Sequence, residues 1–143
     1  APPAGPVRFD FRDNALNTVT SIDVDLDANG NYTVNSPLTA GTYSLSIKPS
    51  GFLRKSVSVN TSGNPTGVDF MLVNGDIDGD NAITVFDYGI LSDYFDKSNS
   101  DSDWATVGDN GFAPRDADLD LDGAVTVFDY GMLSDNFDKA GDE

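Results

Sequence analysis

A duplicated stretch constrains this chain more than any other feature of its sequence. The run GDIDGDNAITVFDYGILSDYFDK, from Gly75 to Lys97, returns forty-two positions later as ADLDLDGAVTVFDYGMLSDNFDK, from Ala117 to Lys139. A repeat of this length predicts that the two copies share one local structure and one chemistry. Each copy is therefore expected to hold the same kind of site.

Each copy has oxygen-bearing residues at the spacing of an EF-hand calcium loop. Side-chain oxygens stand at positions 1, 3 and 5, a backbone carbonyl is available at 7, and a hydroxyl and a carboxylate follow at 9 and 12. Ca²⁺ takes about six to eight oxygens, so a short loop must aim alternate residues inward. The predicted ligands are Asp76, Asp78, Asp80, Ala82, Thr84 and Asp87 in the first copy and Asp118, Asp120, Asp122, Ala124, Thr126 and Asp129 in the second.

Position 6 of each loop supports this interpretation. The backbone must turn there with φ > 0, which glycine adopts most readily and asparagine next. The second copy has Gly123 at this position, and the first has Asn81. One acidic loop by itself is also compatible with a solvated turn, but two copies that agree at every ligand position favour calcium.

Asp23, Asp25 and Asp27 form a third group of acidic residues. They alternate with apolar residues, so three carboxylates stand in one row on a predicted strand, each about 6.6 Å from the next. A third calcium site is one interpretation. The sequence favours the other, a solvated strand face followed by a hairpin turn at Asn29-Gly30, because the closing position of an EF-hand loop would fall on Val34.

Composition narrows the chemistry further. The chain has no cysteine and no histidine, which excludes disulfides, Ser-His triads and most zinc sites. Of its 24 acidic residues only Glu143 is a glutamate, and aspartate suits tight loops better than helices. Because the paired carboxylates are committed to calcium, no pair remains for acid–base catalysis, and we expect no enzymatic activity.

The formal charge of −16 argues against nucleic acid and against an anionic membrane surface as partners. No apolar run approaches the roughly 18 residues of a membrane span, so no membrane insertion is expected, and no signal peptide is visible. The start at Ala1 and the demand for calcium are typical of a processed, exported protein. We therefore predict an extracellular or cell-surface location.

Alternating apolar and polar residues predict β-structure in the first half of the chain. Turn residues such as Asn29-Gly30 and Pro49-Ser50-Gly51 separate the alternating runs. Six or seven short strands with frequent turns predict a small antiparallel β-sandwich after an extended lead-in at residues 1–6. The alternating apolar residues are Val7, Phe9, Phe11, Ile22, Val24, Leu26, Tyr43, Leu45, Ile47, Val57, Val59, Val68, Phe70 and Leu72.

Part of this half resembles a known module. The run GTYSLSIKPSGFLRKSVSVN, from Gly41 to Asn60, is similar to the prealbumin-like sandwiches of carboxypeptidase regulatory-like and Cna-B-type domains. The resemblance covers about half of the predicted sandwich and implies the same kind of β-sandwich fold.

A short helix is predicted after each calcium loop, because apolar residues recur there at i, i+3 and i+7. The segments before the loops are too short for an entering helix. The stretch from Ser98 to Arg115, between the copies, should be a connecting loop pinned by Trp104 and Phe112. The apolar helix residues are Tyr88, Leu91 and Phe95 in the first copy and Tyr130, Leu133 and Phe137 in the second.

A duplicated calcium loop with an exiting helix and no entering helix resembles the type I dockerin, whose motif is similar to G-D-x-(D/N)-x-D-G-x-(V/I)-x-x-x-D-x-x-x-L. The resemblance runs from Gly75 to Lys139. It implies an α-helical module with two EF-hand-type calcium loops that docks to a cohesin-like receptor. The residues on motif positions are Asp76, Asp78, Asp80, Ile83, Asp87 and Leu91, and Asp118, Asp120, Asp122, Val125, Asp129 and Leu133.

Two features depart from that family. Dockerins usually present polar residues at loop positions 10 and 11, where this chain has the apolar pairs Val85-Phe86 and Val127-Phe128. Because these positions supply no metal ligand, we expect a protein contact to use them. The helices also contain Gly89 and Gly131, whose cost of about 1 kcal/mol each predicts a close neighbour at both.

These features together predict two small domains, an antiparallel β-sandwich over residues 1–73 and an α-helical dockerin-like module over residues 74–143. A sandwich followed by such a module resembles the tails of many large exported bacterial proteins. The predicted function is calcium-dependent protein–protein assembly by docking to a cohesin-like receptor. The alternative is a structural subunit that assembles with copies of itself into an extracellular filament, tube or surface layer.

Overall fold

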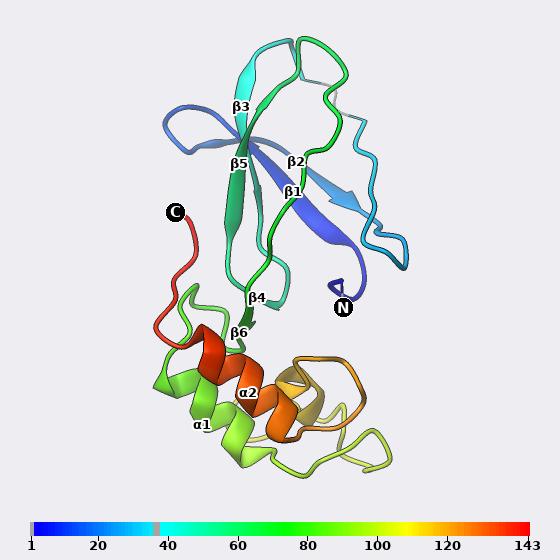
Figure 1. Ribbon diagram of the computed structural model, residues 1–143, viewed down its shortest axis with the longest axis vertical. Coiled ribbons are helices and arrows are strands. Elements are labelled where there is room, and N and C mark those ends of the chain that lie inside the picture. Colours follow the sequence, from blue (N-terminus) through cyan, green and yellow to red (C-terminus); the bar gives the residue numbers. More distant parts are fainter. Residues whose placement is uncertain (1, 36–37) are drawn as a thin grey trace. The chain divides into compact units, whose positions relative to one another are not determined.

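Two units of structure follow one another in the computed structural model, which describes residues 2–35 and 38–143 (Figure 1). The first, called here the sheet unit, consists of Pro2–Pro49, Arg54–Leu72 and Asp142–Glu143. The second, called the loop–helix unit, consists of Ser50–Leu53 and Val73–Gly141. Residues 50–53 therefore belong to the loop–helix unit and residues 142–143 belong to the sheet unit, although each piece lies on the other side of the domain boundary predicted after residue 73.

The alternating runs form one antiparallel sheet in the sheet unit. Its strand order is β2-β1-β3-β5. Phe9 of β1 lies opposite Ile22 of β2 and Ile47 of β3, so apolar side chains meet on one face of the sheet. The strands are β1 Val7–Arg12, β2 Thr18–Val24, β3 Thr42–Ile47 and β5 Lys55–Asn60.

The buried face of this sheet carries the first core. The Phe9 ring packs edge-on against Phe70 and at a tilt against Tyr32, with centroid distances of 5.8 and 4.8 Å. Extended chain covers the sheet here, in a sandwich-like arrangement. The buried residues are Val7, Phe9, Phe11, Val24, Leu45, Ile47 and Val59, and those packed against them include Tyr32, Val34, Leu38, Val68, Phe70 and Leu72.

The covering layer is not the second sheet that the sequence predicts. Val68, Phe70 and Leu72 alternate as a strand does, yet residues 61–72 contain no strand. The Tyr32 hydroxyl fastens this segment by donating a hydrogen bond to the carbonyl of Val68. The prediction of six or seven strands is therefore wrong for the described residues of this unit, which hold four. Alternation of apolar and polar residues predicts which side chains are buried, but it does not predict whether the backbone pairs with a neighbouring strand.

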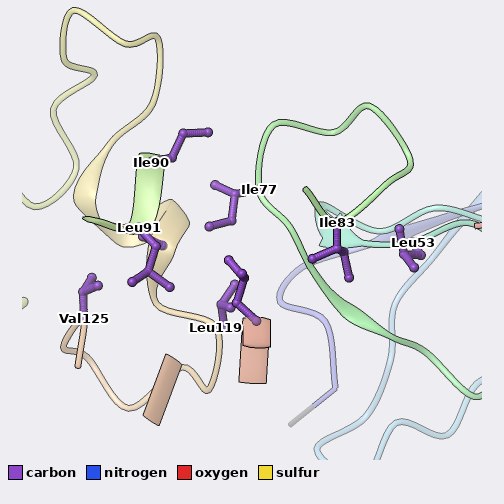
Figure 2. Close-up of a cluster of buried hydrophobic side chains, with 9 residues drawn as sticks. Leu53, Ile77, Ile83, Ile90, Leu91, Leu119 and Val125 are labelled. Carbon is purple, nitrogen blue, oxygen red and sulfur yellow. The ribbon is translucent and has the colours of Figure 1, made fainter. Parts of the chain in front are cut away.

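The loop–helix unit is built on the duplicated stretch. Ile83 and Val125, at position 8 of the two loops, are fully buried in its core (Figure 2). Trp104 and Phe112 pack against this core, as predicted for the connecting loop. The elements are β4 Gly51–Phe52, β6 Asn74–Asp76, α1 Val85–Asp93, the 3-10 helix η1 Pro114–Ala117 and α2 Val127–Asn136.

These elements correct the predicted fold class. A β-sandwich followed by an α-helical module is wrong, because the regular structure is mainly β and the described residues contain just two α-helices, of nine and ten residues. Phe95 and Phe137, expected on the helices, lie beyond their ends and are about half exposed. The helices stop early because Asp96 and Asp138 turn the chain with φ of 66° and 64°. No helix in the described part of the chain combines the length and apolar character needed to span a membrane.

Candidate metal centres

Three carboxylates converge in each copy of the duplicated loop, with one oxygen of each within 4.8 Å of the other two. The backbone at position 6 turns as predicted, with φ of 74° at Asn81 and 93° at Gly123. Of the remaining predicted carboxylates, Asp87 of the first copy and Asp122 of the second lie outside these tight groups. The converging residues are Asp76, Asp78 and Asp80 in the first copy and Asp118, Asp120 and Asp129 in the second.

The closing aspartate of each loop also holds the backbone of that loop. Asp87 is fully buried, and its Oδ1 accepts hydrogen bonds from the N–H groups of Ile77 at 2.7 Å and Asp78 at 3.1 Å. Its Oδ2 accepts a third from Thr84 N–H at 2.8 Å. Asp129 makes the equivalent three bonds in the second copy, at 2.7, 3.2 and 2.7 Å. One carboxylate thus ties the start of each loop to its end, a role that the sequence analysis did not predict.

Position 9 of each loop begins a helix. Thr84 Oγ1 accepts a hydrogen bond from Phe86 N–H, and Thr126 Oγ1 accepts one from Phe128 N–H, both at 3.2 Å. Together with the closing aspartates, these threonines form capping boxes at the starts of α1 and α2. The pattern Thr-x-x-Asp could have revealed these caps from the sequence, since the threonine and the acidic residue stand three positions apart.

Each loop is braced by the segment that follows the helix of the other copy. Ile83 N–H donates to the Lys139 carbonyl at 2.8 Å, and Val125 N–H donates to the Lys97 carbonyl at the same distance. Ile83 and Val125 also accept bonds, from Asp138 and Asp96 N–H, both at 2.9 Å. The predicted position-7 residues form antiparallel β-bridges with the same segments: Ala82 lies opposite Ala140, and Ala124 lies opposite Ser98.

The converging carboxylates repel one another and are partly removed from water. Burial raises the pKa of the Asp78 and Asp118 carboxyls above the ordinary value, and the charges of neighbouring aspartates add to the rise. Such a cluster favours a bound proton or a bound cation. The donors are carboxylate oxygens, the ligand class that hard divalent cations prefer. The residues present therefore fit a calcium ion in each loop.

The third acidic group differs from its predicted strand and hairpin. β2 ends at Val24, so only Asp23 of the three lies on a strand, and the described residues between Val24 and Thr42 contain no strand to complete a hairpin. Asp23 forms an ion pair with Arg8 at 3.0 Å, and Asp27 accepts hydrogen bonds from Asn29 and Asn31 N–H in the following turn. Among the described residues, no third group of acidic side chains gathers as tightly as the two in the loops. Asp23 and Asp27 are thus committed to an ion pair and a turn.

Position 4 differs between the two copies, with a measurable consequence. Gly79 has φ of 79° in the first loop, and Leu121 adopts φ of 62° in the second while being 47% exposed. Because leucine is strained in this region, we expect Leu121→Gly to raise the free energy of unfolding by up to about 1 kcal/mol. The reverse change, Gly79→Leu, should lower it by a similar amount. Thermal denaturation gives both signs, and a stabilised Gly79→Leu chain would contradict the strain.

Two apolar pairs are exposed where the helices begin. Val85 and Phe86 are 62% and 70% exposed, and Val127 and Phe128 are 61% and 69% exposed. A protein contact was expected at these positions, and both pairs are exposed in the structure. Exposed apolar side chains that recur at equivalent positions mark a candidate protein-binding surface. We call these four residues the Val-Phe surface.

Two glycines and two tyrosines lie on the same helices. A Cβ added to Gly89 or Gly131 would meet nothing within 4 Å, so the prediction of a close neighbour at these glycines is wrong within the described chain. Tyr88 and Tyr130 stack edge-on with centroids 5.5 Å apart, which links α1 to α2. The glycines leave room for another molecule to approach the helices closely.

No family model matches the chain, and no curated protein matches it significantly. Comparison with solved structures does give neighbours. A chain of an N-terminal interface mutant of the type II Cohesin-X-Dockerin complex from Acetivibrio cellulolyticus matches with a TM-score of 0.69 and 22% identity. The match covers 94% of this chain and 82% of that one.

A chain of a C-terminal interface mutant of the same type of complex, also from Acetivibrio cellulolyticus, matches with a TM-score of 0.68 and 23% identity, over 94% of this chain and 83% of that one. The likeness concerns the fold, since identity is low. This chain is mainly β, with two short α-helices among its described residues, and it shares its fold with a chain from a type II cohesin–X-dockerin complex. That fold replaces the class predicted from the sequence.

Proposed function

We propose that this chain is a non-catalytic, extracellular calcium-binding protein that joins protein assemblies by docking to a cohesin-like receptor. The observation that carries the proposal is the duplication itself: both copies converge carboxylates in a loop and both expose an apolar pair at the next helix. The fold likeness to chains of cohesin–X-dockerin complexes supports an assembly module of that kind.

Calcium would be held by the loop residues that converge in each copy, with the closing aspartates and the position-7 carbonyls within the same loops. When bound, the ion supplies positive charge that offsets the repulsion among the carboxylates. The chain's own residues hold the loops in shape. Asp87 and Asp129 accept hydrogen bonds from backbone N–H groups of their loops, and each loop forms a β-bridge with the segment that follows the helix of the other copy. Loading at one loop should therefore help to order the segment that braces the other.

The Val-Phe surface would make the contact with the receptor. Its two halves occupy positions 10 and 11 of the two equivalent loops, and neither half belongs to the core of the loop–helix unit. Ordering a loop orders the capping threonine and hence the first turn of the helix that carries the apolar pair. Calcium binding and partner binding would be coupled in this way.

A second function, self-assembly into a polymer, is favoured by one observation: both halves of the Val-Phe surface are exposed at once. A chain with two equivalent exposed apolar surfaces can bind two other copies of itself at once. Docking to one receptor requires only one of them.

Phe86→Asp and Phe128→Asp are expected to weaken partner binding or self-assembly at least tenfold while leaving both calcium sites filled, because each change puts a charge on an apolar contact without touching a loop oxygen. Met71→Asp is the matched control, since Met71 is 86% exposed and lies in the sheet unit. Binding to the type II cohesin is measured by surface plasmon resonance, and polymer growth by light scattering.

Growth into polymers in calcium favours the structural subunit, and a monomer that binds the cohesin favours docking. A monomer that does neither would contradict both functions. Full binding by the Phe86→Asp, Phe128→Asp double variant would remove the Val-Phe surface from the proposal, whatever the partner.

A further inference from the structure

The sheet unit contains a cavity of about 890 Å³, lined by one face of the sheet and by two segments of the chain that covers it. Its size falls within the range of about 300 to 1,000 Å³ that is usual for small-molecule sites. Phe11, Leu45 and Val59 line it from β1, β3 and β5, and all three are buried. The covering segments contribute residues 30–35 and 38 and residues 61 and 63–69. Because the described residues of these segments form no second sheet, they leave this space beside the apolar face.

Hydrogen bonds hold the two covering segments in place. Asp27 accepts two from Asn31, one from its N–H group at 2.9 Å and one from its side-chain amide at 2.8 Å. The Tyr32 hydroxyl, which donates to the Val68 carbonyl, joins the first segment to the second. The walls of the cavity are therefore set by the chain's own contacts before any ligand binds.

The side chains available to a ligand are neutral and polar. Thr33, Asn35, Asn64 and Thr66 line the cavity, are exposed, and make no side-chain hydrogen bond within the described part of the chain. Amide groups supply both donors and acceptors, and a hydroxyl acts as either. Asp69 is the one charged side chain among the described lining residues, which include no lysine or arginine. The cavity therefore combines an apolar floor with uncharged hydrogen-bonding groups.

We propose that this cavity is a binding site for a neutral oligosaccharide. Sugar hydroxyls donate and accept, so they match the amide and hydroxyl side chains, and the C–H faces of a sugar ring match the apolar floor. An anionic ligand would meet the Asp69 carboxylate with no cation to offset it. A lipid would remove the polar side chains from water without giving them hydrogen-bond partners.

This site shares no residue with the calcium loops or the Val-Phe surface, and it lies wholly within the sheet unit. Sugar binding is thus a function separate from the proposed docking, and each can fail without the other.

An array of immobilised oligosaccharides, probed with the labelled full chain in calcium, tests the class of ligand. We expect neutral oligosaccharides to bind, and sialylated or sulfated ones to bind at least tenfold more weakly, because Asp69 repels an anion. Asp69→Asn should narrow that difference. Binding to no neutral oligosaccharide, or a preference for the anionic ones, overturns the proposal.

Isothermal titration with the neutral oligosaccharide that binds most tightly on the array tests the place of binding. Asn35→Ala and Asn64→Ala should each weaken binding about fivefold, because each removes an amide that bonds to sugar hydroxyls. Asn14→Ala is the matched control, since Asn14 is an exposed amide of the same unit that does not line the cavity. An unchanged Kd in the Asn35→Ala, Asn64→Ala double variant, or an equal loss in Asn14→Ala, overturns the cavity as the site.

Discussion

Chelation of calcium is expected to unfold the loop–helix unit at a temperature at which the sheet unit stays folded. Without a cation, the carboxylates of each loop repel one another next to the buried core residues Ile83 and Val125. At free calcium about 100-fold above Kd, binding alone adds about 2.7 kcal/mol per site. For a unit of this size, a change of that order moves the melting temperature by roughly 10 °C or more.

Differential scanning calorimetry with calcium and with EDTA measures this shift, and isothermal titration should count two sites. Magnesium in place of calcium is the matched control, because the smaller ion demands near-octahedral geometry and gives up its water reluctantly. An unchanged melting temperature in EDTA would defeat the proposal that the loops bind calcium.

Asp87→Ala is expected to destabilise the loop–helix unit by about 3 kcal/mol even in EDTA, because it leaves the buried N–H of Ile77 and the partly buried N–H groups of Asp78 and Thr84 without their acceptor. In calcium the loss should grow, since the same residue closes the loop. Thr84→Ala should cost only about 1 kcal/mol, the usual value of a helix cap.

Denaturant unfolding with and without calcium separates the two contributions of Asp87. Asp129→Ala and Thr126→Ala repeat the comparison in the second copy, where the hydrogen bonds are equivalent. Equal losses from the aspartate and threonine changes would contradict the assigned register of the loops. A loss from Asp87→Ala that appears only in calcium would mean that its backbone bonds add nothing.

Local features of the duplicated stretch were predictable from the sequence. The spacing of the aspartates and the positive φ at Asn81 and Gly123 follow from rules that act within about a dozen residues. The same rules place apolar residues on one face of each strand, as Phe9 and Leu45 show. The occupancy of the loops by calcium stays a proposal, since it depends on an ion that only binding experiments can reveal.

The features that the sequence did not predict depend on partners distant in the chain. Alternation at Val68 and Phe70 could not tell a paired strand from extended chain lying on a core, because both bury the same side chains. A backbone hydrogen bond joins Ile83 to Lys139, and Ser56 of β5 donates a hydrogen bond to Asp142, which lies 86 positions further along the chain.

The sequence by itself determined where each loop turns and where the acidic residues and the apolar pairs stand along it. The tertiary structure alone decided what each backbone group pairs with. The physical reason is that side-chain chemistry and backbone torsions are local properties, whereas a peptide group accepts any strand edge or carboxylate that the fold brings within hydrogen-bonding distance. Asp87 illustrates the difference, because the sequence predicted its position as the closing residue of the loop, whereas only the structure showed its three backbone hydrogen-bond donors.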